Sequence, residues 1–370
     1  MRVFFATGEA SGDMLAATLA EAMREFVPEA AFAGIGGERM LGAGFTLTTR
    51  TTGWASLGPF EALRRIPPLV VNVLRHAFWL RASPWDLIVL VDFGAYNLRF
   101  AKTLRALGYR RPILYYFPPG AWLDQATQAA AVAQNTVALT AFEHQRNFYR
   151  ANDLQIAYFG HPLCSLVRPR SARPLAPAGG GSVALLPGSR RGEIERHLPA
   201  LLAACALLRA RRPNARFIVS ASDADAQRQI ERELAASRVS MQIVRGARAA
   251  FDAADAAWIA SGTAVLEATL REVPTVALYV VARAQVQLAR RVWLRRHPFV
   301  TLPNILLGRE VVPECLQERA SPARLAQALD VLLEDPQPQL LAMREVRATL
   351  GAADALRRCA AFAVALARSA

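Results

Sequence analysis

Two short stretches in the second half of the chain have residue types that bind anions. In the first, the apolar run Val183–Leu186 is followed by Gly188, Ser189, Arg190 and Arg191. A strand that ends in a Gly-Ser turn before a helix presents backbone N–H groups at the positive end of the helix dipole. Arginine guanidinium groups bind phosphate oxygens in pairs, so this stretch predicts a phosphate site. The alternative is an ordinary strand-to-helix turn with two solvated arginines.

The second stretch follows the apolar run Ala256–Ile259. Ser261, Gly262 and Thr263 offer hydroxyl and backbone donors where a helix is predicted to begin, which again suits an anion. Glu267 lies one helical turn further on, where its carboxylate either accepts hydrogen bonds from a ribose diol or interacts with the helix dipole. Two anion-binding stretches and a candidate ribose acceptor in one half of the chain favour a nucleoside diphosphate over a lone phosphate.

A third candidate is the segment Leu302–Gln317, which has neither helical nor strand periodicity. Asn304, Glu314 and Gln317 lie among apolar neighbours there. Buried polar groups need partners, and a ligand is one way to supply them. Asn304 and Gln317 are therefore further candidates for ligand contact.

In the first half of the chain, acidic residues stand at the ends of predicted strands. Asp92 ends the apolar strand Asp86–Phe93, and an acid at the carboxyl end of a parallel strand points into the ligand crevice. Asp92 is thus either a general base or a helix cap. The glycine-rich segment Gly8–Asp13 joins the first strand to the first helix and offers sugar or phosphate contacts or, alternatively, a capped turn. Its candidate side chains are Glu9, Ser11 and Asp13.

The remaining polar residues and glycines do not predict a particular catalytic, metal or cofactor site. His161, at the last strand end before a predicted linker, is either an acid–base group or a hydrogen-bonded structural residue. Asp223 and Asp225 have the spacing of a metal-binding pair but are interpreted as the capped start of a helix, and no carboxylate cluster indicates a metal. Gly34–Gly37 lacks the third glycine and the acidic residue of a dinucleotide fingerprint. We expect neither a metal nor a cofactor.

Alternating strands and helices are predicted to position these residues. The alternation indicates an α/β protein with two Rossmann-like domains, each an open parallel sheet covered by helices, facing a cleft. The predicted boundaries are a first domain at 1–167, a Pro- and Gly-rich linker at 168–182, a second domain at 183–345 and a helical tail at 346–370. The predicted strands are Arg2–Thr7, Ala31–Ile35, Asp86–Phe93, Pro112–Phe117, Thr136–Thr140, Val183–Leu186, Arg216–Ser220, Met241–Val244, Ala256–Ile259 and Thr275–Tyr279.

The composition narrows the range of partners. The net charge is +14, from 44 basic and 30 acidic residues, which favours anionic partners. No basic segment interleaved with aromatic residues and no zinc spacing is present, so nucleic acid is not expected. Apolar residues reach 53%, yet no run of about 18 uncharged apolar residues predicts a transmembrane helix. The N-terminus lacks the pattern of a signal peptide and the four cysteines are scattered, as in a cytoplasmic protein.

The segment Trp54–Arg81 is the candidate for contact with a membrane. Its apolar residues recur at near-helical spacing between Leu57 and Phe78, with arginines between them and tryptophans on either side. Such a helix can lie in the membrane interface. The alternative is a helix pair packed on the sheet, and the high apolar content of the chain favours the membrane interpretation.

Taken together and in order, the motifs resemble those of the lipid-A-disaccharide synthase family, which belongs to glycosyltransferase family 19. Each motif alone is weak, but their order and spacing match over nearly the whole chain. The matching motifs are Gly8-Glu-Ala-Ser-Gly-Asp13, Gly160-His-Pro-Leu163, Leu186-Pro-Gly-Ser-Arg190 with Glu193-Ile194, Ala260-Ser-Gly-Thr263 with Leu266-Glu267, and Leu302-Pro-Asn304 followed by Pro313-Glu314 and Gln317.

The resemblance implies a B-type glycosyltransferase fold and an inverting hexosyltransferase of lipid A biosynthesis. The implied donor is UDP-2,3-diacylglucosamine, the acceptor is 2,3-diacylglucosamine 1-phosphate, and the products are the lipid A disaccharide 1-phosphate and UDP. Asp92 lies at the position of the family's essential aspartate and is the expected general base, while Arg190 and the Ser261–Thr263 helix start would stabilise the leaving UDP. The family also implies a homodimer at the inner face of the cytoplasmic membrane.

The chain departs from the family pattern in the first half. Ala95 replaces an acidic residue of the family motif that begins at Asp92, and Leu123–Gln125 replaces a segment that contains a tryptophan and an arginine. UDP-sugar binding is therefore better supported than the identity of the acceptor. The alternatives are a related UDP-sugar epimerase or transferase with another acceptor, or a non-catalytic membrane-bound UDP-sugar binder.

Overall fold

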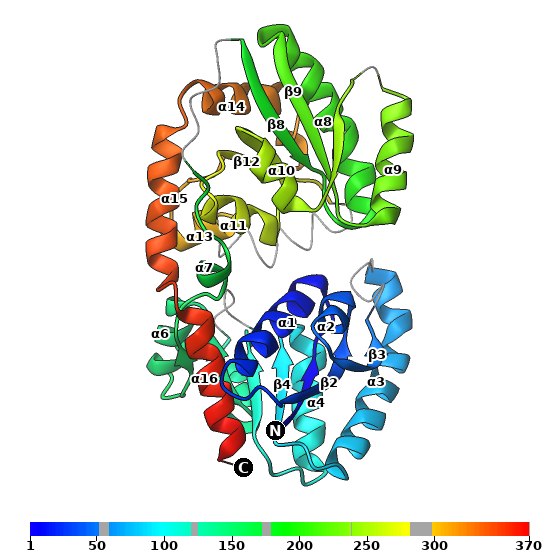
Figure 1. Cartoon of the computed structure of the whole chain (residues 1–370), viewed down its shortest axis with the longest axis vertical. Helices are drawn as coiled ribbons and strands as arrows, with labels where there is room; N and C mark the ends of the chain where they lie inside the picture. Colours follow the sequence, from blue (N-terminus) through cyan, green and yellow to red (C-terminus); the bar gives the residue numbers. More distant parts are fainter. Residues whose placement is uncertain (52–58, 120–124, 172–178, 238, 282–297, 370) are drawn as a thin grey trace. The chain divides into compact units, whose positions relative to one another are not determined.

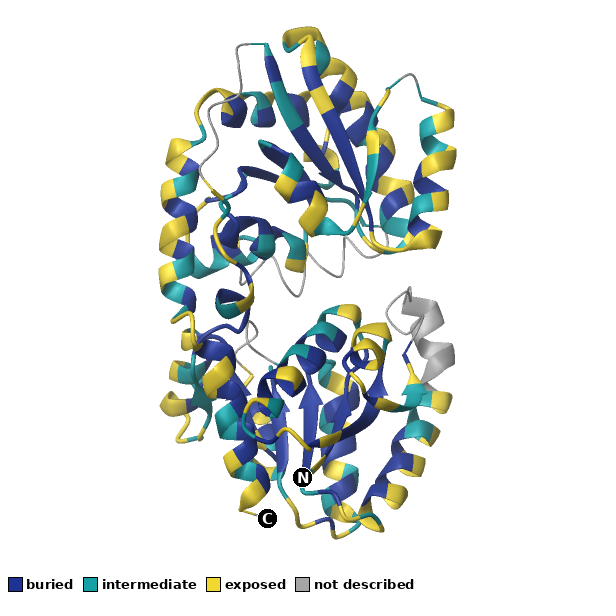
Figure 2. Ribbon diagram, viewed as in Figure 1, coloured by how far each residue is buried: buried dark blue, intermediate teal, exposed yellow. Residues whose placement is uncertain are grey.

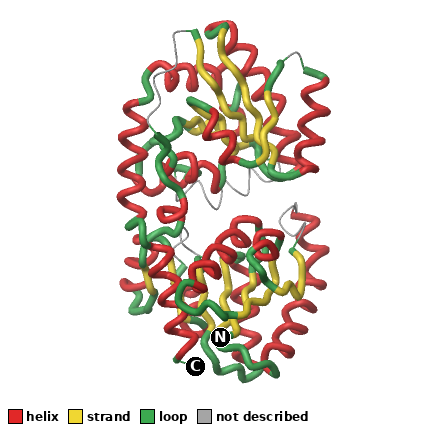
Figure 3. The backbone as a smooth tube through the Cα atoms, in the orientation of Figure 1, coloured by secondary structure: helices red, strands yellow, loops and turns green. Residues whose placement is uncertain are grey.

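The chain forms two compact units, each with one parallel sheet. The computed structural model describes all 370 residues except 52–58, 120–124, 172–178, 238, 282–297 and 370. One unit comprises Met1–Leu166 with Leu350–Ala370, and the other comprises Val167–Thr349. Helices cover both faces of each sheet (Figures 1 and 3). The predicted architecture of two α/β domains is confirmed.

The first unit has a seven-stranded sheet in the order β3-β2-β1-β4-β5-β6-β7. All of its strand pairs are parallel. Because the order reverses between β1 and β4, the carboxyl ends of these two neighbours form the switch point at which open α/β sheets bind ligands. The strands are β1 Arg2–Ala6, β2 Ala31–Gly36, β3 Thr46–Arg50, β4 Leu87–Val91, β5 Ile113–Tyr116, β6 Val137–Thr140 and β7 Ala157–Tyr158. The helices are α1 Ala10–Arg24, α2 Glu38–Gly42, α3 Pro59–Arg81, α4 Gly94–Ala106, α5 Ala126–Asn135, α6 Glu143–Ala151, α7 Leu163–Leu166 and α16 Ala355–Arg368.

The second unit has a six-stranded parallel sheet in the order β10-β9-β8-β11-β12-β13. Its switch point lies between β8 and β11, so the segments after these two strands are neighbours. The strands are β8 Gly180–Leu186, β9 Asn214–Ala221, β10 Gln242–Arg245, β11 Ala256–Ala260, β12 Thr275–Tyr279 and β13 Glu314–Leu316. The helices are α8 Arg191–Arg211, α9 Ala224–Ala235, α10 Ala247–Ala253, α11 Thr263–Leu270, α13 Leu302–Leu307, α14 Pro322–Glu334 and α15 Gln337–Leu350, with a short 3₁₀ turn at Gln317–Arg319.

The central strands of both sheets are buried apolar runs. Leu87–Val91 is fully buried along its length, as a parallel strand covered on both faces requires (Figure 2). In the first unit, separate hydrophobic clusters fill the two sides of the sheet. In the second unit, Trp258 is fully buried, and its indole N–H donates to the carbonyl of Leu325 at 3.0 Å.

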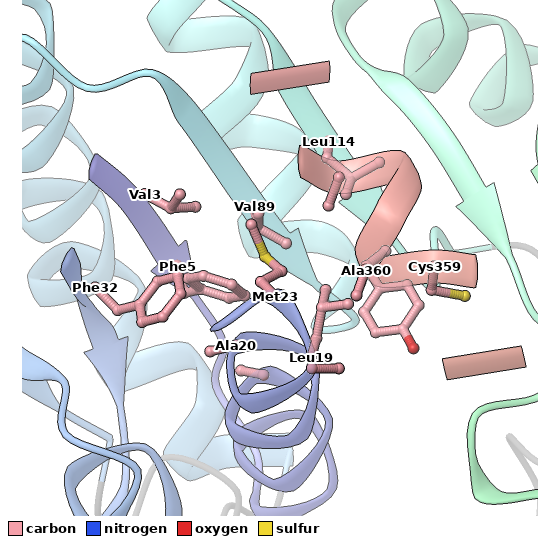
Figure 4. Close-up of a cluster of buried hydrophobic side chains, with 14 of the residues drawn as sticks. Val3, Phe5, Leu19, Ala20, Met23, Phe32, Val89, Leu114, Cys359 and Ala360 are labelled. Atoms are coloured by element: carbon pink, nitrogen blue, oxygen red, sulfur yellow. The ribbon is translucent and has the colours of Figure 1, made fainter. Parts of the chain in front are cut away.

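The C-terminal helix belongs to the first unit, which differs from the predicted separate tail at 346–370. Figure 4 shows Leu19 and Met23 of α1 in one hydrophobic cluster with Cys359 and Ala360 of α16. The small side chains of α16 let the two helices approach closely. The sequence shows the apolar face of this helix, but not that the face lies against a helix formed some 340 residues earlier in the chain, because periodicity does not name the partner.

The predicted linker at 168–182 also differs from the structure. Strand β8 already begins at Gly180, and the backbone N–H of Arg170 donates to the carbonyl of Arg271 at 3.1 Å. The Arg170 guanidinium donates to the carbonyls of Ala254 and Asp255, so Arg170 is attached to the rest of the second unit. The middle of the predicted linker, 172–178, lies outside the described residues.

Candidate active site

The end of strand β4 has an unusual backbone. Asp92 and Phe93 follow the strand directly, with φ of 48° and 51°. Residues with a side chain adopt this left-handed conformation only where their surroundings hold it, and such residues concentrate at functional sites. Gly8, at the end of the neighbouring strand β1, makes room for the turn, because a Cβ at this position would lie 2.4 Å from the Phe93 ring.

Hydrogen bonds hold this turn from two sides. The Asp92 carbonyl accepts from Asn97 Nδ2 at 2.8 Å and from the Tyr115 hydroxyl at 3.1 Å. The Asp92 N–H donates to the carbonyl of Tyr116 at 3.0 Å. Asn97 and Tyr115 are fully buried. The backbone of the predicted catalytic residue is therefore fixed by α4 and β5, and no sequence signal indicated these partners.

The Asp92 carboxyl is poised for proton transfer near neutral pH. Its pKa is raised from 3.8 to about 6, chiefly by burial and then by the charge of Glu9, while a hydrogen bond from the backbone of Phe93 acts in the opposite direction. Glu9 lies at the start of α1, beside the switch point between β1 and β4. The structure therefore brings two of the predicted residues, Asp92 and Glu9, into one electrostatic environment.

The Asp13 carboxylate is bonded to backbone groups of the protein, and its predicted contact with the substrate stays a prediction. One of its carboxylate oxygens accepts from the Gly37 N–H at 2.7 Å and from the Met40 N–H at 3.3 Å. The other oxygen accepts from the Arg39 N–H at 2.8 Å. The side chain is 5% exposed, so it joins α1 to the turn before α2. Ser11, half-buried in the first turn of α1, stays a candidate for substrate contact.

His161 is buried, and its surroundings favour the structural one of its two predicted roles. Burial lowers its pKa to about 3, and its Nδ1 accepts a hydrogen bond from the Leu163 N–H at 3.2 Å. The rings of Phe117 and Phe142 pack against it. Its backbone N–H donates to the carbonyl of Leu350 at 2.7 Å. The histidine therefore helps to attach the C-terminal segment to the first unit.

In the second unit, the predicted phosphate site lies after β8 at the switch point. Gly188 has φ of 118°, and a Cβ there would lie 2.5 Å from the Glu193 carboxylate. The same carboxylate accepts from the Ser189 N–H at 3.1 Å and the Arg190 N–H at 3.3 Å. Glu193 thus closes a capping box at the start of α8, an arrangement that shapes the turn from within. The motif indicated Glu193, but not that it occupies these donors.

The charged side chains of this turn differ in their surroundings. Arg190 lies 3.5 Å from Glu193, and its side chain is 41% exposed. Arg191 pairs with Glu195 at 2.8 Å on the outside of α8. Arg190 therefore stays the predicted partner of the phosphate, while Arg191 is bound to Glu195.

The segment after β12 is attached to the same helix. The His197 ring joins the carbonyl of Pro187, at 2.8 Å, to the N–H of Val280, at 3.0 Å. Arg196 Nε donates to the carbonyl of Val280 at 3.1 Å. His197 is fully buried, and burial lowers its pKa, so it is a neutral link between the ends of β8 and β12. Its position within the helix gave no sign of this role in the sequence.

The second predicted stretch lies directly beside the first, since β8 and β11 are neighbours. Gly262 and Thr263 are exposed at the start of α11, and Ser261 is half-buried. The Glu267 carboxylate accepts a hydrogen bond from Arg271 Nε at 3.2 Å. Glu267 thus has a protein partner in addition to its predicted role towards a ribose.

The Asn304 side chain has protein partners for both of its polar atoms, and its predicted contact with the nucleotide stays a prediction. Its side chain is fully buried, and its Oδ1 accepts from the N–H groups of Val311 and Val312 at 2.7 and 2.8 Å. Its Nδ2 donates to the Val312 carbonyl at 2.8 Å and to Glu314 at 2.9 Å. Glu314 also accepts from the N–H of Thr301 at 2.8 Å. The protein itself supplies the partners that a ligand was expected to supply.

Gln317 lies at the carboxyl end of β13, on the same edge of the sheet as the two anion-binding stretches. Its φ is 52°, so its backbone is left-handed, as are those of Asp92 and Phe117 at the ends of β4 and β5. The side chain is half-buried. These features fit the predicted ligand contact. The predicted metal-like pair has a structural role, because Asp223 caps α9 by accepting from the Ala226 N–H at 2.8 Å.

No group of three or more potential metal-binding side chains occurs within the described ranges. Both switch points instead have polar groups on short turns after parallel strands: a carboxyl pair in one unit and exposed backbone donors with an arginine in the other. Two Rossmann-like units with such sites define the B-type class of glycosyltransferases and related nucleotide-sugar enzymes.

Comparison with known proteins identifies the family. The family model described as lipid-A-disaccharide synthetase matches residues 3–364, so the chain belongs to this family and is a glycosyltransferase. A lipid-A-disaccharide synthase of Azotobacter vinelandii is 37% identical, with 90% of each chain covered. One from Synechocystis is 34% identical over 97% of this chain and 96% of the relative.

Solved structures confirm the fold at low sequence identity. A UDP-GlcNAc 2-epimerase from Neisseria meningitidis, bound to UDP-GlcNAc, matches with a TM-score of 0.65 at 11% identity, covering 99% of this chain and all of the other. A spinosyn rhamnosyltransferase in complex with thymidine diphosphate matches with a TM-score of 0.58 at 13% identity, covering 99% of both chains. The predicted B-type fold is therefore confirmed.

Proposed function

We propose that this chain joins UDP-2,3-diacylglucosamine to 2,3-diacylglucosamine 1-phosphate, giving lipid A disaccharide 1-phosphate and UDP. Membership of the family supports the reaction. The observation on which the mechanism rests is the pair of switch points, each with the chemistry that one substrate needs. The first has a carboxyl group with a raised pKa, and the second has the exposed Arg190 guanidinium and the exposed helix start at Gly262 and Thr263.

In the second unit, the donor's diphosphate binds at the start of α8. The Arg190 guanidinium binds the anion, and Gly262 and Thr263 at the start of α11 offer exposed backbone donors, while the N–H groups of Ser189 and Arg190 donate to Glu193 and shape the turn. These groups neutralise the charge that develops on the departing UDP. Glu267 and Gln317 are the proposed contacts for the ribose and base. UDP binding by the solved relative in the epimerase class agrees with a nucleotide site in this fold.

In the first unit, Asp92 acts as the general base. Its carboxylate takes the proton from the acceptor 6-hydroxyl as that oxygen attacks the anomeric carbon, and the bond from this carbon to UDP breaks in the same step. One displacement inverts the anomeric configuration, which gives the β-linkage. A base with a pKa of about 6 is ionised at neutral pH and still accepts a proton more readily than an ordinary aspartate. Glu9 and Ser11 are the proposed acceptor-side contacts.

Helix α3 is the proposed membrane contact of the first unit. One side of the helix packs inward through Val73, Ala77 and Leu80, and Asn72 accepts a hydrogen bond from the Tyr96 hydroxyl at 2.7 Å. The other side exposes large apolar residues beside Arg75 and Arg81. The exposed apolar residues are Val71, Leu74, Phe78 and Trp79. One helix, and not the alternative helix pair, thus has a packed side and an exposed apolar side, and the latter supports the proposed membrane contact. The beginning of the segment, with Trp54, lies outside the described residues.

This surface suits a chain that works on acylated substrates at an interface. An amphipathic helix with arginines on its polar border binds anionic lipid surfaces through apolar burial and charge attraction. No helix in the described part of the chain is long and apolar enough to span a bilayer. We place the protein at the inner face of the cytoplasmic membrane, and the family resemblance adds a homodimer to this proposal.

The membrane contact is tested by sedimentation with vesicles that contain anionic phospholipid. Val71→Ser with Phe78→Ser should lower the bound fraction, while Val331→Ser, which changes a residue of similar exposure on α14, should leave it unchanged. Equal binding of all three proteins would exclude α3 as the contact.

The reaction is tested with purified protein, UDP-2,3-diacylglucosamine and 2,3-diacylglucosamine 1-phosphate. The wild type should release UDP and form the disaccharide, both followed by mass spectrometry. UDP release without a disaccharide would indicate another acceptor, and the absence of both products would refute the proposal. An epimerase would instead convert the donor to its epimer, and no disaccharide would form together with UDP.

A further inference from the structure

The turn that presents Asp92 contains two successive residues in the left-handed region. Asp92 has φ of 48° and Phe93 has φ of 51° with ψ of 54°. Neither residue is glycine, so this backbone persists only if neighbouring groups stabilise it more than they would a relaxed turn. The groups that meet this backbone therefore decide where the Asp92 carboxyl lies.

Two fully buried side chains from different elements meet the carbonyl groups of this turn. The Tyr115 hydroxyl, from β5, donates to the carbonyls of Asp92 and Gly94 at 3.1 and 3.2 Å. The amide of Asn97, from α4, donates to the Asp92 carbonyl at 2.8 Å. A carbonyl turned inward by a left-handed residue would otherwise be buried without a donor, which disfavours that conformation.

Asn97 also ties the turn to both strands of the switch point. Its Nδ2 lies 3.1 Å from the carbonyl of Val91, at the end of β4, and 3.3 Å from that of Ala6, at the end of β1. Only the NH₂ side of the amide can face three carbonyls, so the orientation of the side chain is determined by its surroundings. The end of β1 leads directly into Gly8 and Glu9, the other carboxylate of this site.

We propose that Tyr115 and Asn97 are positioning residues of the transfer reaction, which hold the Asp92 carboxyl in place by fixing the left-handed turn that bears it. This inference rests on the proposed role of Asp92 as the base. It goes further in assigning part of the catalytic rate to two side chains that have no contact with substrate. Loss of either donor lets the turn relax and moves the carboxyl away from its place.

The chain offers a matched control for the tyrosine. Tyr149 is buried in the same hydrophobic cluster as Tyr115, and its hydroxyl has no hydrogen-bond partner in the described part of the chain. Tyr149→Phe and Tyr115→Phe remove the same atom from the same core. Only the second change removes donors from the Asp92 turn, so a difference between the two variants reports on the turn and not on packing.

The test measures kcat, KM for each substrate, UDP affinity and the pH profile of wild type, Tyr115→Phe and Tyr149→Phe. Tyr115→Phe should lower kcat at least tenfold, with KM values and UDP affinity within about twofold of wild type, since a base placed wrongly slows the chemical step alone. The acidic limb of its profile should move to lower pH, because a relaxed carboxyl is less buried and further from Glu9. Besides Glu9, the titratable group that interacts with Asp92 is Tyr115 itself, which is neutral throughout this range. Tyr149→Phe should match wild type.

Asn97→Leu gives a second test in which the side chain keeps its approximate volume but loses its donors. Like Tyr115→Phe, it should lower kcat and leave the KM values close to those of wild type. If it does not fold, Tyr115→Phe alone decides. A kcat of Tyr115→Phe within twofold of both wild type and Tyr149→Phe would overturn the proposal.

Carbon-13 NMR of labelled aspartate makes the test independent of turnover. The Asp92 carboxyl signal, identified by its loss in Asp92→Asn, should titrate at lower pH in Tyr115→Phe than in wild type and Tyr149→Phe. An unchanged titration would refute the positioning role even if wild type proved inactive with the proposed substrates. Inactive wild type with a shifted titration would refute the proposed function and leave the positioning of Asp92 supported.

Discussion

Replacement of Asp92 by asparagine should make the fold more stable at neutral pH while it abolishes turnover. The pKa of Asp92 is raised from 3.8 to about 6 in the folded protein, chiefly by burial and then by the charge of Glu9. Between these two pH values the folded state binds more protons than the unfolded state, so the stability of the fold decreases as the pH rises through this window. Above pH 7 the ionised carboxyl thus destabilises the fold, and a neutral amide removes this penalty.

The size of the effect follows from the same two values. A rise from 3.8 to about 6 corresponds to roughly 3 kcal/mol, because each tenfold change in proton affinity equals about 1.4 kcal/mol. The amide accepts a weaker hydrogen bond from the Phe93 backbone than the carboxylate does. We therefore expect the free energy of unfolding to rise by about 1–3 kcal/mol in Asp92→Asn. For a unit of this size, such a gain raises Tm by roughly 2–10 °C.

The assay is thermal unfolding of wild type and Asp92→Asn at pH 8 and at pH 4, with turnover measured at pH 8. The gain in Tm should be present at pH 8 and absent at pH 4, where both side chains are largely neutral, while kcat falls about 10²–10⁴-fold. Asp153→Asn is the control, because Asp153 is an exposed aspartate of the same unit that also has a left-handed φ, of 56°. A Tm at pH 8 that is unchanged or lower in Asp92→Asn would refute the assignment of a destabilising, buried carboxyl.

Three further outcomes are expected. Arg190→Ala should weaken UDP binding about 10–100-fold by calorimetry with little change in Tm, since the side chain is 41% exposed and loses a charged partner for phosphate; unchanged affinity would exclude Arg190 from the donor site. Gly8→Ala should lower kcat, because the new Cβ would lie 2.4 Å from the Phe93 ring and must displace the Asp92 turn; full activity would show that the turn is not constrained from this side. Asn304→Ala should lower the free energy of unfolding by about 2–4 kcal/mol, since four buried hydrogen bonds are lost, and denaturant unfolding that matches wild type would contradict its structural role.

The strands that the sequence pattern missed lie at the edges of the sheets. Thr46–Arg50 and Ala157–Tyr158 are the edge strands of the first sheet, and Glu314–Leu316 is an edge of the second. Edge strands pair on one side only and need not be apolar on both faces, so they lack the apolar run that identifies a central strand. The central strands are covered on both faces and are therefore continuous apolar runs, so they were predicted within a few residues.

The site was predictable where function depends on a local motif, and not where it depends on distant partners. The turn at Gly188–Arg190 and the acid Asp92 follow central strands, and topology alone brings such positions to the switch points. That Tyr115 holds the Asp92 backbone depends on the packing of two neighbouring strands, which no spacing records. At Asn304 the sequence shows a polar residue among apolar neighbours, which predicts that a partner exists. It does not show whether that partner is a ligand or, as in the structure, the backbone of Val311 and Val312.

The attachment of α16 to α1 has a consequence for the order in which this protein can fold during synthesis. The first unit lacks the apolar cover of Leu19 and Met23 until residues 350–370 have been made. At ordinary translation rates the ribosome needs on the order of 10–40 seconds to add the residues between the two parts of this unit. During that time the second unit can complete its core while the first cannot. The nascent chain therefore exposes an apolar helix face late into synthesis, and loss of even a short stretch at the C-terminus would affect the unit that contains the N-terminus.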